Sequence, residues 1–220
     1  MDTQALISLL GEGLVQTLIM TLVSTLIAYV IGLPIGVSLI VTSPNGIHPM
    51  GAYNKVMGFI VNVVRSVPFL ILMIALIPYI RMIIGTGIGT AATTAALIVA
   101  AVPFVARMVE QSLLEVDPGV IEAAQAMGAS NLQIICKVLL LEARPSLLNG
   151  AAVATITILG YSAMAGALGG GGLGDIAIRY GMYRFQPTIM WITVIILVIL
   201  VQVLQDVGVK IAAKLDNRTK

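Results

Sequence analysis

The chain has 220 residues, of which 59% are hydrophobic and only 10% are charged, and its formal net charge is +2. Its mean hydropathy of +1.05 lies far above the range of soluble globular proteins, so the composition predicts an integral membrane protein. The small net charge and the scattered aromatic residues give no indication of nucleic-acid binding. A single cysteine, Cys136, excludes an intrachain disulfide, and one histidine leaves no cluster of metal ligands.

Stretches that are poor in charge predict five transmembrane helices, each with about the 20 residues that a membrane crossing requires. Asp2 and Glu12 precede any basic residue, so we expect no cleaved signal peptide. The predicted fold is therefore all-α, with one transmembrane domain over residues 1–220. The five helices are expected at residues 14–41, 57–80, 90–113, 146–168 and 187–209.

The loops carry an unequal share of basic residues, and this predicts the orientation. Basic loops stay in the cytoplasm, so the richer side is expected to be cytoplasmic. The N-terminus then lies outside and the C-terminus inside, in a multi-pass protein of the bacterial cytoplasmic (inner) membrane. The richer side holds Lys55, Arg107, Lys137, Arg144, Lys210, Lys214, Arg218 and Lys220, and the other side holds Arg81, Arg179 and Arg184.

Arg65 interrupts the second expected span, within the run Arg65-Ser66-Val67-Pro68. An arginine at the bilayer centre costs about 2.5 to 3.5 kcal/mol on insertion scales, so such a residue usually faces the bundle interior or a water-filled cavity. Against this, Arg65 lies only about 12 Å past the expected membrane edge, within partial reach for its long side chain to snorkel. The residues alone leave both interpretations open.

The loop 107–144, between the third and fourth spans, contains a predicted short helix over residues 118–127. Asp117 is suited to cap this helix, and Pro118 fits its first position, where a missing N–H costs nothing. Gly128 offers the left-handed residue that ends it. About ten helical residues rise about 15 Å, which suits a groove on another protein and is too short to span a bilayer.

A second helix is expected directly after this one. Ser130 and Gln133 have the spacing of a capping box, in which each side chain satisfies the other's free backbone N–H. The loop is therefore predicted to be a helical hairpin outside the membrane. A docking site for a partner protein is the first interpretation, and a cytosolic hairpin without a partner is the alternative.

Four consecutive glycines follow the fourth span. Gly169, Gly171 and Gly174 satisfy the dinucleotide-binding fingerprint in letters, but they follow a membrane helix instead of a strand, and we reject that interpretation. The phosphate-binding Gly-x-x-x-x-Gly-Lys-Ser/Thr motif is absent from the sequence, so this chain is not expected to hydrolyse ATP itself. Two interpretations remain for the glycines: a flexible or closely packed re-entrant stretch at the outer face, or a plain periplasmic linker.

Taken together, these motifs resemble those of the methionine ABC-importer permeases, over essentially the full chain. Glu122-Ala123-Ala124 followed by Gly128 matches the "EAA" loop of importer permeases, although Leu141 stands where that family usually has proline. The other matching motifs are Arg65-Ser66-Val67-Pro68-Phe69, the stretch from Gly160 to Gly174, Asp175-Ile176 and Tyr180-Gly181.

The resemblance implies an ABC type I importer permease fold and the transport of L- and D-methionine across the cytoplasmic membrane. The implied partners are a second permease copy, two cytoplasmic ATPase subunits, an extracytoplasmic substrate-binding lipoprotein and membrane lipid. ATP and Mg would bind the ATPase, so this chain is expected to hold no cofactor and to be no enzyme.

Other functions are alternatives to methionine transport. They are an ABC permease for another amino acid or a small peptide, or a secondary transporter, which the odd number of spans disfavours. A membrane enzyme would need convergent catalytic residues, and the sequence offers none.

The resemblance also implies roles for individual residues. The implied sites are ATPase coupling at Glu122, Ala123, Ala124 and Gly128, a translocation path at Arg65, Ser66, Pro68, Tyr161, Ser162 and Met164, and an external gate at Gly169, Gly170, Gly171 and Gly172.

Overall fold

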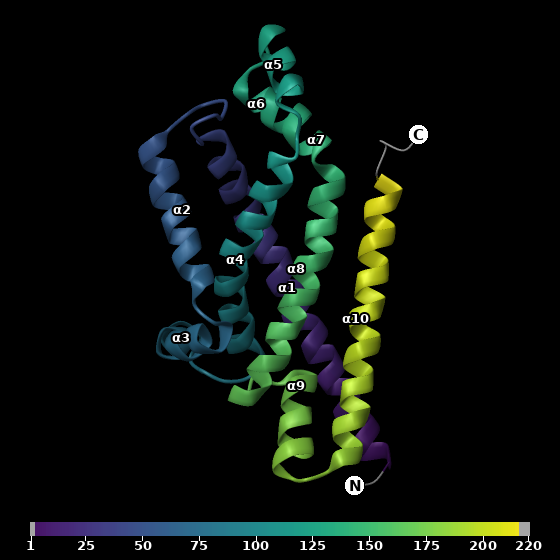
Figure 1. The fold of residues 1–220 in the computed structure, drawn as a ribbon. Helices are drawn as coiled ribbons and strands as arrows, with labels where there is room; N and C mark the ends of the chain where they lie inside the picture. The colour runs from purple at the N-terminus through teal and green to yellow at the C-terminus, as the bar shows by residue number, and fades with distance from the viewer. Residues whose placement is uncertain (1–2, 216–220) are drawn as a thin grey trace. The chain divides into compact units, whose positions relative to one another are not determined.

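The computed structural model describes residues 3–215, and every regular element in that range is a helix (Figure 1). The described chain divides into two compact units. Unit 1 comprises the residues up to 27, 67–101 and 154–205, and unit 2 comprises 28–66, 102–153 and the residues from 206 onward. Four of the five boundaries between the units fall inside long helices, which are α1 (Thr3–Val41), α4 (Thr90–Leu114), α8 (Arg144–Ala165) and α10 (Pro187–Leu215), and the fifth falls between Ser66 and Val67.

Four of the five expected spans, 14–41, 90–113, 146–168 and 187–209, are recovered as single helices, with the largest shift at the start of α1. Four helical stretches of the described chain are long and apolar enough to cross a membrane, and the number rises to five if the broken pair α2–α3 counts as one span. The all-α class is therefore confirmed. Helix α1 starts at Thr3 rather than at residue 14, because the exposed Glu12 side chain does not interrupt a helix at a membrane edge.

The second expected helix, residues 57–80, is wrong as a continuous element. The structure contains α2 (Gly51–Ser66) and α3 (Phe69–Ile84), separated at Val67 and Pro68. Pro68 has an extended backbone, with φ −56° and ψ 135°, and occupies the N-cap of α3. Because a proline disfavours the helical conformation in the residue before it and lacks an N–H, it fits the start of a helix better than its middle.

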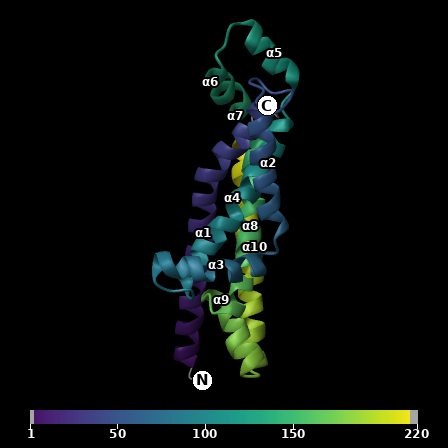
Figure 2. The same ribbon diagram turned by 90° about the vertical axis from the view of Figure 1, so that its left-hand side faces the viewer.

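Unit 1 brings the first part of α1 against the segment that follows α8. That segment contains a 3₁₀ turn η2 (Gly166–Leu168), helix α9 (Gly172–Ile176) and a π-helical stretch η3 (Ala177–Tyr183). Gly13 of α1 packs against Ile176 of α9 so closely that an added Cβ would collide with the isoleucine. Figures 1 and 2 show α3 lying across the other helices of this unit rather than along them.

Unit 2 contains the end of α1, helix α2, and the second part of α4 followed by the loop helices. These are α5 (Pro118–Ala126), α6 (Asn131–Ile134), η1 (Ile135–Leu139) and α7 (Leu140–Glu142). Gly32 and Gly36 of α1 pack closely against α4. An added Cβ would lie 2.9 Å from the Val102 carbonyl oxygen at Gly32 and 2.5 Å from that of Ala106 at Gly36, so α1 and α4 meet backbone to backbone there.

Several hydroxyl side chains inside the long helices bond within their own helix. Thr25, Thr94 and Thr193 each donate to the carbonyl oxygen four residues earlier, at 2.7 to 2.8 Å. Thr42, at the end of α1, makes the same bond to Ser38 at 2.7 Å. Threonine hydroxyls commonly bond one turn back in helices, and in an apolar surrounding this removes the cost of an unpaired polar group.

Candidate functional site

The loop helix α5 has the local structure that the sequence predicts. The Asp117 carboxylate accepts a hydrogen bond from the Gly119 N–H at 2.7 Å, and Pro118 is the first helical residue. Gly128 has φ +79° and ends the helix. Ser130 and Gln133 form both bonds of the capping box. Helix α5 is therefore fixed at both ends by groups that lie within the loop itself.

One side of α5 packs on unit 2 and the other side is free in the described chain. Ala124 is 5% exposed, whereas Glu122 and Ala123 are exposed and Met127 is 82% exposed. A cavity of about 270 Å³ adjoins the start of α5 and is lined largely by apolar side chains, including Ile40, Leu113 and Ile121. Helix α5 therefore exposes Glu122 and Ala123, while its other side packs on unit 2 next to this cavity.

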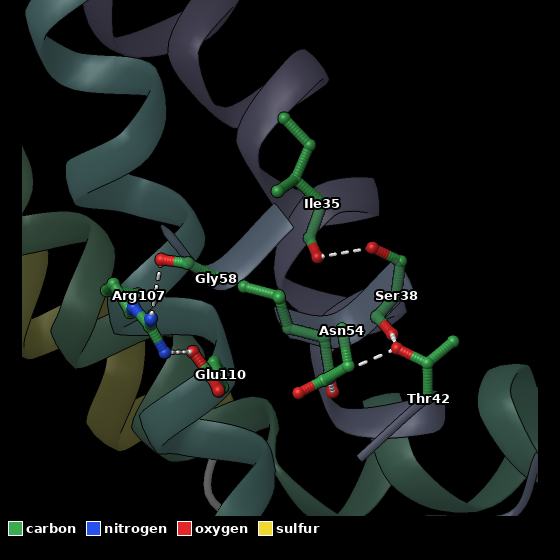
Figure 3. A network of polar contacts seen from close by, with 8 residues as sticks. Ile35, Ser38, Thr42, Asn54, Gly58, Arg107 and Glu110 are labelled. Carbon is green, nitrogen blue, oxygen red and sulfur yellow. Dashed lines mark hydrogen bonds and ion pairs between the residues drawn. The ribbon is translucent and has the colours of Figure 1, made fainter. Parts of the chain in front are cut away.

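A polar network ties α2 to both of its neighbours in unit 2 (Figure 3). The Asn54 side-chain amide donates to the Leu39 carbonyl oxygen at 2.7 Å and to the Thr42 hydroxyl at 3.1 Å, both at the end of α1. On the other side, the Arg107 guanidinium of α4 donates to the Gly58 carbonyl oxygen at 3.2 Å.

Glu110 completes this network and was not predicted as part of any site. Its carboxylate pairs with Arg107, and both side chains are largely buried, at 17% and 20% exposed. Opposite charges three residues apart on a predicted helix are the sequence signal that indicates such a pair. The helix end from which this loop begins is therefore held to α2 by the Arg107 hydrogen bond to Gly58, and the partly buried ion pair with Glu110 fixes the guanidinium that makes this bond.

The four glycines of unit 1 form a tight turn between α8 and α9. Three of them, Gly169, Gly171 and Gly172, have positive φ angles of 75° to 80°. Other residues pay a steric penalty in this conformation, because it brings Cβ close to the backbone. The turn is therefore built on backbone angles that the glycine run makes accessible.

Packing around this turn favours the closely packed interpretation over a plain linker. Gly170 is buried, and an added Cβ there would lie 2.6 Å from the Thr93 hydroxyl. The Thr93 hydroxyl donates to the Gly170 carbonyl oxygen at 3.3 Å, and the Gly89 N–H donates to that of Gly169 at 2.9 Å. The start of α4 thus holds the first half of the turn.

Helix α1 holds the second half of the turn. The Gly172 N–H donates to the Gln16 side-chain carbonyl oxygen at 2.8 Å, and the Leu173 N–H donates to the Thr17 hydroxyl at 2.9 Å. Sequence reasoning missed Gln16 and Thr17. Their only signal is a pair of adjacent polar residues, which α1 repeats at Ser24 and Thr25 and which does not identify a partner 156 residues away.

The residues expected along a translocation path fall into both units. In unit 1, Tyr161 stacks on Phe69, with ring centroids 4.9 Å apart and planes 6° from parallel. Met164 is 51% exposed, one turn further along α8. Ser162 is 1% exposed and its hydroxyl donates to the Leu159 carbonyl oxygen, so in the described chain it faces the interior of the unit.

In unit 2, Arg65 and Ser66 form the exposed end of α2. The Ser66 hydroxyl donates to the Asn62 carbonyl oxygen at 2.8 Å, within its own helix. Together with Pro68 at the start of α3, these residues flank the break in the second span. Backbone groups freed at such a break are tolerated at membrane depth where protein or water satisfies them.

Comparison with known proteins decides the family. Residues 32–214 match the family described as the inner membrane component of binding-protein-dependent transport systems. The chain belongs to this family. Members of the family are permease subunits and not catalytic proteins, so the chain is a transport permease and not itself an enzyme.

Relatives of this inner membrane component are methionine permeases by name. The chain is 50% identical over 182 residues to the probable D-methionine transport system permease protein MetI of Vibrio cholerae, which covers 83% of this chain and 81% of that protein. It is 41% identical over 180 residues to the methionine import system permease protein MetP of Bacillus subtilis, covering 82% and 81%.

A solved structure is similar to this inner membrane component over almost its whole length. A chain described as an inward facing conformation of the MetNI methionine ABC transporter matches with a TM-score of 0.96 at 46% identity, covering 98% of this chain and 100% of that one. An amino acid ABC transporter matches with a TM-score of 0.73 at 23% identity, which supports the fold alone. The ABC importer permease fold is therefore confirmed.

Proposed function

We propose that this chain is the transmembrane permease subunit of an ATP-driven importer that carries L- and D-methionine across the bacterial cytoplasmic membrane. The observation that carries the proposal is the match to the MetNI methionine transporter over nearly the full length of both chains. Relatives at 41–50% identity with methionine transport names support the same substrate. The functional complex contains two copies of this chain, two ATPase subunits that bind ATP and Mg, and a substrate-binding lipoprotein.

Roles follow for the three sets of residues. Glu122, Ala123, Ala124 and Gly128 couple the permease to the ATPase, which agrees with the outward face of α5 and with its fixed ends. The Gly169–Gly172 turn forms the external gate. The translocation path is assigned to Arg65, Ser66, Pro68, Tyr161, Ser162 and Met164; the first three flank the broken span, and Ser162 acts from a buried position.

The test of this proposal is substrate competition in a reconstituted complex. The permease, its ATPase and its binding lipoprotein are placed in vesicles, and uptake of radiolabelled L-methionine is measured against an excess of D-methionine, of other amino acids and of dipeptides. We expect competition from both methionine enantiomers. Competition by a different amino acid or a dipeptide alone would assign the importer to that substrate instead.

The proposed topology has the N-terminus outside and the C-terminus in the cytoplasm, and the units agree with it. All six basic residues that are described on the richer side belong to unit 2, and the three on the other side belong to unit 1. The six are Lys55, Arg107, Lys137, Arg144, Lys210 and Lys214, whereas Arg218 and Lys220 lie outside the described residues.

Thiol labelling tests the topology. Cys136 is exposed on η1, next to the coupling helix. A membrane-impermeant thiol reagent is expected to leave Cys136 unlabelled in intact cells and to label it once the membrane is opened, in cells that express the permease without its ATPase. A Ser8→Cys variant in a Cys136→Ser background should be labelled in intact cells. Labelling of Cys136 from outside would invert the orientation and remove the proposed ATPase contact.

A further inference from the structure

We propose that Gln16 and Thr17 are positioning residues of the external gate, which hold the Gly169–Gly172 turn closed and release it when the gate opens. This inference rests on the proposed function, because it takes the glycine turn as the gate. The two side chains belong to the first part of α1 and the turn lies between α8 and α9, all within unit 1 (Figure 1).

Helix α9 lacks a side-chain cap of its own. Its N-cap residue is Gly171, which has no side chain to accept a hydrogen bond from the first turn. The first backbone N–H groups of a helix need partners from outside it. Here the Gln16 amide oxygen and the Thr17 hydroxyl provide them, at 2.8 Å and 2.9 Å. The start of α9 is therefore satisfied by side chains of α1.

Water does not replace the bond from the Leu173 N–H to the Thr17 hydroxyl, because both residues are buried. Thr17 is 1% exposed and Leu173 is 0% exposed. A buried donor that loses its only partner carries the full cost of desolvation, which exceeds the net gain of an ordinary hydrogen bond. The Thr17 hydroxyl also donates to the Gly13 carbonyl oxygen at 2.9 Å, so its accepting lone pair is left facing Leu173.

The turn approaches α1 so closely that only glycine, which has no Cβ, leaves enough room between them. An added Cβ at Gly171 would lie 2.8 Å from the Gln16 carbonyl oxygen, and one at Gly172 would lie 2.6 Å from the Thr17 hydroxyl. Gly172 also has φ +76°. The glycines thus bring the backbone within hydrogen-bonding range of α1, in addition to supplying the turn angles.

The two sides of this contact lie far apart in the chain, one in the first part of α1 and the other at the start of α9. The family match begins at residue 32. Gln16 and Thr17 precede it, whereas Gly172 and Leu173 lie well inside it. The first part of α1 therefore acts as a strut on the gate from outside the stretch that the family model matches, and the similar MetNI chain includes a counterpart of it, since the match covers 98% of this chain.

The direction of the effect follows from population shift. The structurally similar MetNI chain is described as inward facing, and we take the present structure as the corresponding state, with the outer gate closed. Contacts that exist only in the closed state favour it, so removing them favours the open state. Under the proposed function, the ATPase drives this opening. Weakening the contact should therefore raise ATP hydrolysis in the absence of binding protein.

The test compares Thr17→Val with Thr17→Ser in the reconstituted complex. Valine keeps the shape of threonine and removes the acceptor, whereas serine keeps the acceptor. Thr25→Val is the matched control, because the Thr25 hydroxyl bonds only to its own helix in this structure. We expect Thr17→Val to raise ATP hydrolysis without binding protein by about fivefold and to lower methionine uptake per ATP by a similar factor. Thr17→Ser and Thr25→Val should stay close to the unsubstituted complex.

The opposite outcomes are equally clear. If Thr17→Val lowers ATP hydrolysis and uptake together, in proportion to the yield of complex, the contact is structural only and the proposal is overturned. Unchanged rates would also overturn it. If Thr17→Val does not assemble, Gln16→Leu decides by the same two readouts. ATP hydrolysis needs no methionine, so failure of the unsubstituted complex to take up methionine would count against the proposed substrate and not against the strut.

Discussion

Replacing Gly172 with valine is expected to abolish methionine uptake and to lower the yield of assembled complex. Gly172 is buried with φ +76°, and a Cβ there would lie 2.6 Å from the Thr17 hydroxyl and 2.8 Å from the Met20 methyl group. A β-branched residue in the left-handed region costs about 1 to 2 kcal/mol or more, and overpacking adds about 1 to 3 kcal/mol. Uptake of radiolabelled methionine by cells, measured beside the yield of purified complex, tests both effects.

Gly169→Val separates backbone conformation from packing. Gly169 has nearly the same φ, +75°, but it is exposed and nothing lies within 4 Å of an added Cβ. This variant carries the conformational penalty alone, so we expect it to retain most of its uptake. Equal losses in both variants would assign the effect to the backbone angle, and near-normal uptake in Gly172→Val would restore the interpretation of this stretch as a plain linker.

A second large effect is expected at the coupling helix, where Ala123→Arg should prevent recovery of the ATPase with the permease. Ala123 is exposed beside Glu122 on the face of α5 that is free in the described chain. An arginine at the centre of a packed interface separates the two surfaces, and its charge must leave water for the complex to form. We expect such a substitution to weaken binding of the ATPase by at least about 3 kcal/mol, or about a hundredfold in affinity. Co-purification of the tagged permease with its ATPase measures the loss.

Two companions make this result specific. Ala52→Arg is the control, because Ala52 is an exposed alanine near the start of α2, and it should leave co-purification unchanged. Ala124→Arg places the charge on the 5% exposed face that packs on unit 2, so it should lower the thermal stability of the permease itself. Full ATPase recovery with Ala123→Arg would contradict the proposed coupling face.

Local signals in the sequence predicted local structure well. Asp117, Gly128 and the Ser130–Gln133 pair each act on groups within four residues of themselves, so their effects do not depend on the rest of the fold. The long apolar helices were also found, because long apolar stretches admit few other structures, although the second was expected to be continuous and is broken at Val67 and Pro68. The coupling, gate and path roles, and the single domain over residues 1–220, stay predictions.

Features that depend on long-range contact were not accessible in this way. Pro68 is compatible with either a kinked helix or a helix start, and only the packing of Phe69 on Tyr161 and its neighbours selects the start. The hydrogen bonds from Gln16 and Thr17 to the turn join residues 156 positions apart. Neither residue stands out in composition or spacing, so their partner becomes visible only in three dimensions.

The self-satisfied threonines of the long helices have a consequence for biogenesis. Thr25, Thr94 and Thr193 carry their bonding partner on the preceding turn of the same helix, so these hydroxyls present no unmet donor to lipid before any neighbouring helix arrives. These three hydroxyls therefore need no neighbouring helix when their segment enters the bilayer. Thr17 and Thr93 differ, since each bonds the glycine turn. Those bonds form only after α1, α4 and α8 have all been inserted, so closure of the turn is a late event in the assembly of the subunit.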